Sequence, residues 1–231
     1  MKDFELMLAP MEGYTGYKFR ELCYKKSADS TFTEMARTSA LARNNKSTLQ
    51  KIVIPNPIPT YIQIIGSNIN ELDKFLKNYK PQEGFLGFNL NLGCPSPNMI
   101  RRGLGCALIK RISKLKKIVE TIHNYGYSAS IKLRLGMNQY EKDKKIYLNL
   151  INEVDADFFI VHARHGKERD RNPSDFSVYK ECVETNKIII ANGDINTINQ
   201  IKYLKSIGVK GAMIGREAIK NPGIFNELKQ Y

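Results

Sequence analysis

Short apolar runs alternate with amphipathic stretches along the whole chain, and this alternation constrains the fold more than any other feature. Several runs, such as FFIVH at Phe158–His162, are almost continuously apolar, as expected of strands covered on both faces of a parallel sheet. The expected strands are Leu6–Pro10, Thr31–Met35, Thr60–Ile65, Gly84–Asn91, Ala129–Arg134, Phe158–His162, Ile188–Asn192 and Ala212–Gly215.

Helical periodicity separates these runs, and it is clearest after the fourth strand. There the apolar residues recur every three or four positions, at Leu108, Ile112, Leu115, Val119 and Ile122. The other expected helices are Thr38–Asn44 (short), Tyr17–Lys26, Asn70–Tyr79, Glu141–Val154, Asp175–Glu184, Thr197–Ser206 and Glu217–Lys229.

Eight strands alternating with about eight helices in 231 residues predict an α/β protein with one domain, a single (β/α)8 TIM barrel over residues 1–231. An open doubly wound sheet is the alternative. That fold usually has a Gly-rich turn after its first strand, and here the turn reads APMEGYTG. We therefore favour the barrel.

The charge balance points to a polyanionic partner. The chain has 36 Lys and Arg against 23 Asp and Glu, a net charge of +13, which favours nucleic acid, although a biased genome would also enrich lysine. No stretch approaches the roughly 18 apolar residues of a membrane span. The four cysteines show no metal-ligand spacing. We expect a cytoplasmic protein that needs neither membrane nor metal.

Polar residues follow every expected strand, where barrel enzymes gather their functional groups. Asn192-Gly193-Asp194 and Gly215-Arg216 end the last two strands, where many barrels bind phosphate. Lys132 and His162 would lie beside them, and Gln63 could pair with a pyrimidine-like edge. Tight turns and a satisfied buried histidine are the simpler explanations of the glycines and of His162.

Cys94 lies in the loop NLNLGCPSPNMIRRGLG, where a thiol could donate a proton to carbon. The other three cysteines are expected in the core. Seven cations and no acidic residue lie between Met99 and Lys117, and they form either a solvated helix face or a contact to phosphates: Arg101, Arg102, Lys110, Arg111, Lys114, Lys116 and Lys117.

Six segments together resemble the tRNA-dihydrouridine synthases over residues 6–228. They are LAPMEGYTGYKFREL, NLNLGCPSPNMIRRGLGCALI, SIKLRLG, FFIVHARH, IIIANGDI and AMIGREAI. The resemblance implies a barrel that binds flavin mononucleotide (FMN) and reduces uridine to 5,6-dihydrouridine in RNA, first of all tRNA. Hydride would come from reduced FMN, a proton from Cys94, and NADPH would regenerate the flavin.

The resemblance also implies roles for individual residues. Asn91 and Arg134 would lie by the substrate base, and the basic residues Arg101, Arg102 and Arg164 are further expected RNA contacts. The implied flavin contacts are Pro10, Met11, Gln63, Lys132 and His162 around the isoalloxazine, with Asn192, Gly193, Asp194, Gly215 and Arg216 toward the ribityl chain and phosphate.

Three departures from the family pattern stand out. His165 replaces a threonine, Gly16 replaces an aspartate, and the C-terminal helical RNA-binding domain usual in the family is not expected in this chain. The charge of the barrel or a protein partner could replace that domain. A flavin enzyme of a free pyrimidine, similar to dihydroorotate dehydrogenase, and a non-catalytic RNA-binding flavin barrel remain alternatives.

Overall fold

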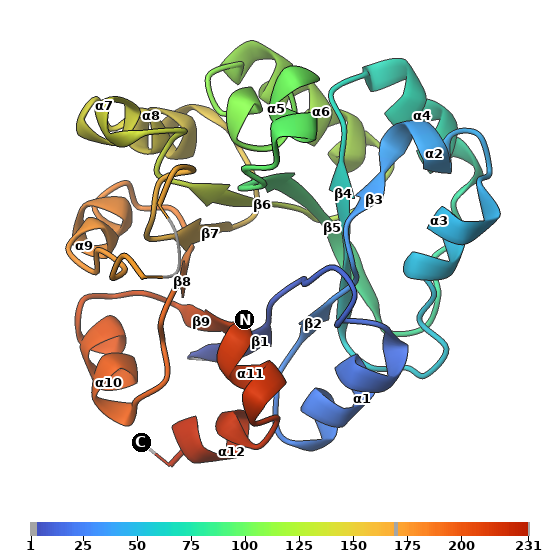
Figure 1. Ribbon diagram of the computed structural model, residues 1–231. Coiled ribbons are helices and arrows are strands. Elements are labelled where there is room, and N and C mark those ends of the chain that lie inside the picture. The colour runs from blue at the N-terminus through green and yellow to red at the C-terminus, as the bar shows by residue number, and fades with distance from the viewer. Residues whose placement is uncertain (1–3, 169–170, 231) are drawn as a thin grey trace.

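The strands form one parallel sheet that curves into a barrel, with the helices on its outside (Figure 1). The computed structural model describes residues 4–168 and 171–230. The strands are β1 Glu5–Leu8, β2 Thr31–Phe32, β3 Ala36–Arg37, β4 Thr60–Ile65, β5 Phe85–Leu92, β6 Ala129–Arg134, β7 Phe159–His162, β8 Ile189–Asn192 and β9 Gly211–Ile214. The predicted (β/α)8 barrel is confirmed.

The ring nearly closes between its first and second strand positions. The sheet order is β1-β9-β8-β7-β6-β5-β4-β2, and the Leu8 amide donates to the Ser30 carbonyl at 2.9 Å to join the two ends. The second position is interrupted between β2 and β3, where one strand was predicted. Thr33 lies in this interruption, and its hydroxyl accepts from the backbone amide of Gln63 at 3.0 Å. This side-chain hydrogen bond replaces a backbone hydrogen bond between the strands.

Most predicted helices are present, but two are divided. Glu141–Val154 becomes two helices because Lys145 adopts a left-handed conformation with φ of 50°. Glu217–Lys229 divides next to Pro222, which has no amide hydrogen to continue a helix. The helices are α1 Tyr17–Lys25, α2 Thr38–Leu41, α3 Lys46–Lys51, α4 Ile69–Asn78, α5 Pro97–Arg101, α6 Ile112–Asn124, α7 Gln139–Asp143, α8 Ile146–Glu153, α9 Val178–Val183, α10 Ile198–Ser206, α11 Arg216–Lys220 and α12 Ile224–Leu228, with a 3₁₀ turn η1 at Gly105–Leu108.

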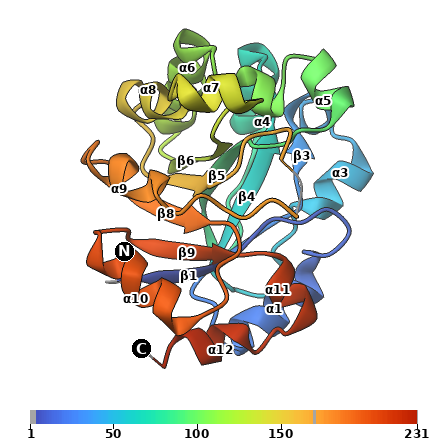
Figure 2. The ribbon, with the colours of Figure 1, turned by 60° about the vertical axis from the view of Figure 1, so that its left-hand side comes forward.

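The last helices pack beside the first strand and helix (Figure 2). Lys229 after α12 forms an ion pair of 2.7 Å with Asp29, and the other Asp29 oxygen accepts from the Leu6 amide at 2.9 Å. The two ends of the described chain are thereby tied to each other. No helix in the described ranges is long and apolar enough to cross a bilayer.

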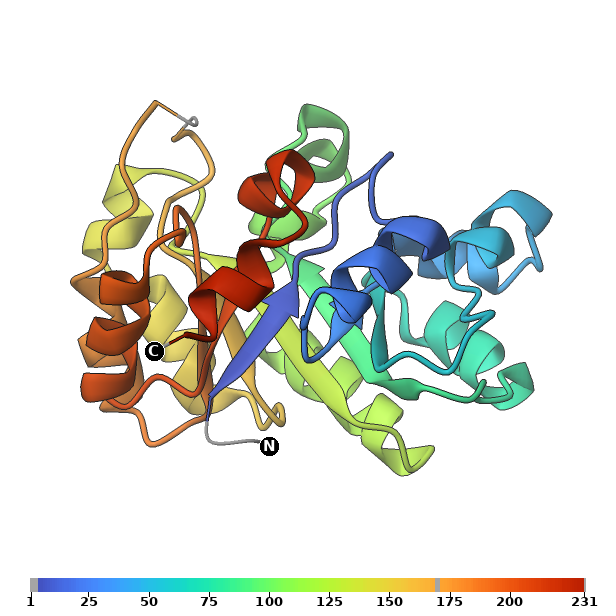
Figure 3. The same cartoon turned by 90° about the horizontal axis from the view of Figure 1, so that it is seen from below.

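Two apolar layers position the site. Side chains alternate along each strand, so one set packs outward against the helices, while a smaller set, including Phe32, Phe158, Ile160 and Met213, forms a separate inner cluster. This inner cluster closes the barrel below the carboxyl ends of the strands. The loop after β1, α5 and α11 all rise at that end of the barrel (Figure 3).

Candidate functional site

Two adjoining cavities open at the carboxyl ends of the strands. The Arg216 cavity, about 180 Å³, is lined by the ends of β1, β8 and β9, and the Cys94 cavity, about 210 Å³, by the ends of β4, β5 and β6. Pro10, Lys132 and His162 line both cavities. Every residue that the sequence assigned to the flavin lines one or both: Pro10, Met11, Gln63, Lys132, His162, Asn192, Gly193, Asp194, Gly215 and Arg216.

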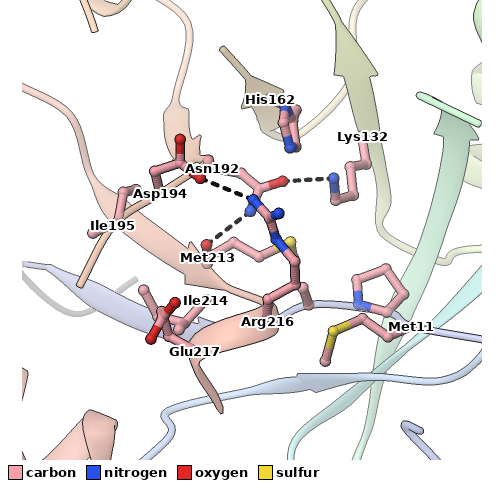
Figure 4. Close-up of a pocket in the computed structure, with 14 residues that line it drawn as sticks. Met11, Lys132, His162, Asn192, Asp194, Ile195, Met213, Ile214, Arg216 and Glu217 are labelled. Atoms are coloured by element: carbon pink, nitrogen blue, oxygen red, sulfur yellow. Dashed lines mark hydrogen bonds and ion pairs between the residues drawn. The ribbon is translucent and has the colours of Figure 1, made fainter. Parts of the chain in front are cut away.

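Asn192 holds Lys132 at the boundary between the cavities (Figure 4). The Lys132 ammonium donates to Asn192 Oδ1 at 2.7 Å, and Asn192 Nδ2 donates to the Met213 carbonyl at 2.8 Å. The Tyr179 hydroxyl also bonds both backbone groups of Asn192, at 2.8 and 3.1 Å. Burial, with the charge of Arg134, lowers the pKa of Lys132 to about 7. Lys132 is therefore a positioned cation that exchanges its proton near neutral pH.

His162 is a neutral imidazole at the same boundary. Burial and then the charge of Lys132 lower the pKa of His162 well below its ordinary value. Its Nδ1 is buried and has no hydrogen-bond partner among the residues that the structure describes. A buried polar atom without a partner is costly, so this nitrogen is a ready contact for a ligand.

Asp194 anchors the cation of the Arg216 cavity (Figure 4). The carboxylate accepts from Arg216 at 2.9 Å, as Figure 4 shows. It also pairs with Arg164. Burial alone would raise the pKa of Asp194, but its hydrogen bond and charge interaction with Arg164 hold that pKa below the ordinary value. The ionised carboxylate stands between two guanidinium groups, of which Arg216 lines the cavity and Arg164 does not.

The chain turns sharply between β8 and Asp194. Gly193 has φ of 119°, and a Cβ there would lie 2.5 Å from Ser174 Oγ. Asp194 itself has φ of 50° and accepts from the Ser174 amide at 3.2 Å. The glycine that the sequence placed at this strand end is thus required both by backbone conformation and by space.

A chain of neutral side chains joins the neighbouring strands β4, β5 and β6 at the Cys94 cavity. Asn91 Nδ2 donates to Gln63 Oε1 at 2.8 Å, Gln63 Nε2 donates to Asn89 Oδ1 at 2.8 Å, and Asn89 Nδ2 donates to Ser130 Oγ at 2.9 Å. The chain fixes which way the Gln63 amide faces. Sequence reasoning missed Asn89 and Ser130 as supporting residues, although polar residues at inward positions of apolar strands were a usable signal.

Asn91 also shapes the loop that carries Cys94. Its Oδ1 accepts from the Gly93 amide at 3.1 Å and from the Cys94 amide at 3.0 Å. The Cys94 carbonyl accepts from Cys106 at 3.1 Å, and Gly105, with φ of 58°, leaves room for it, since a Cβ there would lie 2.4 Å from that oxygen. Cys94 is half-buried on the cavity wall.

The two arginines assigned to the substrate lie in different surroundings. Arg134 lines the Cys94 cavity and donates to the His165 carbonyl at 3.0 Å. Arg164 is only 1% exposed, and its Nε donates to the Asn172 carbonyl at 2.6 Å while the guanidinium pairs with Asp194. Arg164 lines neither cavity, so its place differs from the RNA contact expected from the sequence. His165, which replaces the family threonine, is buried next to it.

Arg101 and Arg102 are exposed at the end of α5, outside both cavities. Two of the seven cations of that stretch are paired, Lys110 with Glu141 and Lys116 with Glu153, each at 2.7 Å. The other five are exposed. The basic surface is therefore smaller than the sequence suggested, and Arg101 and Arg102 lie in the same loop region as Cys94.

Comparisons with known proteins show which family the chain resembles. The family model for dihydrouridine synthase (Dus) matches residues 7–231. The chain is 30% identical over 233 residues to a probable tRNA-dihydrouridine synthase of Helicobacter pylori, covering 97% of this chain and 70% of that protein. It is 26% identical over 223 residues to tRNA-dihydrouridine(20a/20b) synthase [NAD(P)+] of Saccharomyces cerevisiae, covering 94% of this chain and 60% of that protein.

A solved structure supports the fold. N-(5'-phosphoribosyl)anthranilate isomerase from Pyrococcus furiosus superposes with a TM-score of 0.57 at 17% identity, over 97% of this chain and 96% of that one. This likeness concerns the barrel alone. The match of the family model over nearly all residues is the stronger finding, and from it the chain belongs to the dihydrouridine synthase family of enzymes.

Proposed function

We propose that this chain reduces uridine to 5,6-dihydrouridine in RNA, with tRNA as the first candidate, using FMN as cofactor and NADPH as reductant. The observation that carries the proposal is the shared wall of the two cavities. A cavity that contains Arg216 and Lys132 and a cavity with a half-buried thiol meet at Pro10, Lys132 and His162. Such an arrangement suits an anionic cofactor next to a base that must receive a proton.

The residues of the Arg216 cavity fit a flavin mononucleotide. A phosphate needs cations and backbone amides, which Arg216 and the glycine turns at Gly193 and Gly215 provide. The polar edge of an isoalloxazine needs donors and acceptors, which the Lys132 ammonium and the unpaired His162 Nδ1 provide. Bound there, the flavin would supply the hydride that the uracil ring accepts.

The residues of the Cys94 cavity suit transfer of a proton to the uracil ring. The Cys94 thiol would act as the general acid, and a positioned general acid contributes roughly 10²–10⁴-fold to a rate. Asn91 binds the Cys94 amide, so its part is to orient the thiol. Arg134 lines this cavity and donates to the His165 carbonyl, and we expect it to donate a further hydrogen bond to a uracil carbonyl. The cationic residues that line this cavity are Arg134 and Lys132, and the acidic residue Glu12 pairs with Lys51.

RNA as the substrate is supported by charge and by the relatives. The net charge of +13 and the exposed cations after Cys94 favour contact with phosphates. A base inside folded RNA must leave its stack to reach a group at the cavity wall. The H. pylori relative is named for tRNA, and the yeast relative for tRNA and NAD(P)+.

Absorbance and turnover of the purified protein test the proposal together. We expect a yellow protein that releases FMN on denaturation and that, with NADPH, converts uridine in RNA but not free uridine. Reduction of a free pyrimidine in preference to RNA would favour the dihydroorotate dehydrogenase-like alternative. Flavin binding with no turnover on RNA would favour the non-catalytic one, and a colourless protein that takes up no flavin would contradict the cofactor.

A further inference from the structure

Cys106 is a buried neighbour of Cys94, the cysteine on the wall of the Cys94 cavity. The Cys106 backbone amide donates to the Cys94 carbonyl at 3.1 Å, and the Cys106 thiol donates to the Gly93 carbonyl at 3.2 Å. A Cβ at Gly105 would lie 3.0 Å from Cys94 Cβ. The segment that carries Cys106 therefore contacts the segment that carries Cys94, both through its backbone and through the sulfur.

The backbone hydrogen bond keeps the two cysteines within the range of a disulfide. With standard bond lengths on both sides of this contact, the Cα atoms of Cys94 and Cys106 are at most roughly 7 Å apart. Disulfides join Cα atoms that are roughly 4.4–6.8 Å apart. The other two cysteines lie in separate helices, Cys23 in α1 and Cys182 in α9. Cys106 is thus the cysteine that the structure places beside Cys94.

The two thiols differ in access to solvent. Cys94 is half-buried on a cavity of about 210 Å³, which a small oxidant can enter, whereas Cys106 is 1% exposed. Burial also raises the pKa of the Cys106 thiol to about 12, so this thiol stays protonated near neutral pH. An oxidant in the cavity therefore reacts first at Cys94, and Cys106 reacts with the product formed there.

We propose that Cys94 and Cys106 form a site of reversible oxidation, at which a disulfide between them takes the Cys94 thiol out of the cavity wall. Hydrogen peroxide oxidises the Cys94 thiol to a sulfenic acid and is itself reduced to water. The Cys106 sulfur then displaces hydroxide from the Cys94 sulfur, and the hydroxide takes up the proton of Cys106 and leaves as a second water. A dithiol such as dithiothreitol restores both thiols by exchange and is itself oxidised to a cyclic disulfide.

The pairing gives Cys106 a protective effect on Cys94. A sulfenic acid without a thiol partner is oxidised further to a sulfinic acid, which dithiols do not reduce. Capture by Cys106 stops the oxidation at a stage that can be reversed. The disulfide itself does not depend on the proposed function, but its effect on turnover rests on that function, because a disulfide leaves no thiol to protonate the uracil ring.

Mapping of the disulfide in the full chain tests the site without an assay of activity. Trypsin cleaves after Arg101, Arg102 and Lys110, so Cys94 and Cys106 lie on separate peptides. The protein is treated with hydrogen peroxide, free thiols are alkylated, and the digest is analysed by mass spectrometry without reduction. We expect a linked pair of peptides that is lighter than their sum by two hydrogen atoms and that dithiothreitol separates.

Three results of the mapping would overturn the proposal. They are recovery of Cys94 as a free thiol, as a sulfinic acid or in a link to a second chain, in each case without the pair that contains Cys106.

Turnover on RNA tests the protective effect of Cys106. Peroxide should lower dihydrouridine formation by the wild type by roughly 10²-fold or more, the contribution of a general acid, and dithiothreitol should restore most of it. In Cys106→Ala, dithiothreitol should restore little, because Cys94 passes on to the sulfinic acid. Cys182→Ala removes an equally buried thiol from α9 and should recover like the wild type. Each variant is compared with its own untreated sample, and Cys106→Ser is used if Cys106→Ala does not fold.

The outcomes separate this inference from the proposed function. Equal recovery in the wild type and in the Cys106 variant would overturn the protective effect. A linked pair of peptides with unchanged turnover would leave the oxidation site in place and contradict Cys94 as the general acid. A wild-type chain without turnover on RNA would overturn the proposed function, and the linked peptides would still decide whether the oxidation site exists.

Discussion

The two cavities share a wall, but different interactions hold the side chains that line them. The Arg216 cavity depends on ions and on a backbone turn, with Asp194 between two arginines and Gly193 at φ of 119°. The Cys94 cavity depends on neutral amides, with Gln63 and Asn91 in one hydrogen-bonded chain. Charges give affinity for an anion, whereas a fixed amide chain gives orientation. Changes in the first cavity should therefore alter ligand retention, and changes in the second should alter turnover.

The largest expected effect is on turnover, from Cys94→Ala. Dihydrouridine formation should fall by roughly 10²–10⁴-fold, because the general acid is lost. Flavin content and NADPH oxidation should persist, because neither needs the thiol. Nucleoside analysis of the RNA product by mass spectrometry measures the first, and absorbance measures the others.

Cys182→Ala is the control for that variant. Cys182 is fully buried in α9, where burial raises the pKa of its thiol, and we expect stability alone to change. Unchanged product formation in Cys94→Ala would show that another group protonates the base. It would contradict the assignment of turnover to the Cys94 cavity and of ligand retention to the Arg216 cavity.

Arg216→Ala should produce the next largest effect, on retention. FMN should bind roughly tenfold to a hundredfold more weakly, because a charge-assisted contact is lost. With saturating FMN, turnover should return to near the wild-type value. A loss of turnover that excess FMN does not restore would give Arg216 a role in the reaction itself. It would contradict the assignment of the Arg216 cavity to ligand retention alone.

Lys132 at the shared wall should make flavin affinity depend on pH. Its pKa of about 7 means that its charge is lost as the pH rises above neutrality, and an anionic ligand prefers the charged form. The dissociation constant of FMN should therefore rise between about pH 7 and 9, by up to about tenfold per pH unit. Lys132→Met should bind FMN weakly with little pH dependence over that interval. A steep rise retained in this variant would assign the titration to another group.

The smallest effect concerns the outer surface beyond the Cys94 cavity. Arg101→Ala with Arg102→Ala should reduce the slope of log affinity against log salt for RNA by about one to two units, since each neutralised phosphate contributes roughly 0.7 to 0.9. Flavin content should not change. Lys202→Ala with Lys210→Ala, two exposed lysines away from the site, should leave the slope nearly unchanged. An equal loss in both double variants would mean that the positive charge acts without a specific surface.

The strand ends could be predicted because a polar residue stands out after an apolar run. His162 ends β7, whose other residues are apolar, and Lys132 lies near the end of β6; the structure brings both to the shared wall. Asn89 was missed as a member of the amide chain, although its inward position in β5 was a usable signal, because its partners Gln63 and Ser130 come from neighbouring strands.

The sequence pattern did not predict the direction of the Arg164 side chain or the division of helix 141–154. Arg164 follows a strand end as its motif suggests, but its side chain pairs with Asp194, thirty positions along the chain. The predicted helix 141–154 divides where Lys145 adopts a left-handed conformation with φ of 50°, and the Lys145 ammonium pairs with Glu181 of α9. Both outcomes depend on partners from distant segments, and local periodicity does not specify such partners.

Incubation of the purified chain with FMN, NADPH and an unmodified tRNA transcript tests the central claim most directly. The account predicts that a uridine in the digested RNA gains the mass of two hydrogen atoms, that the gain requires all three additions or flavin already bound, and that Cys94→Ala nearly abolishes it. A wild-type chain that binds FMN and oxidises NADPH, yet leaves every uridine of varied tRNA transcripts unchanged, would contradict the claim.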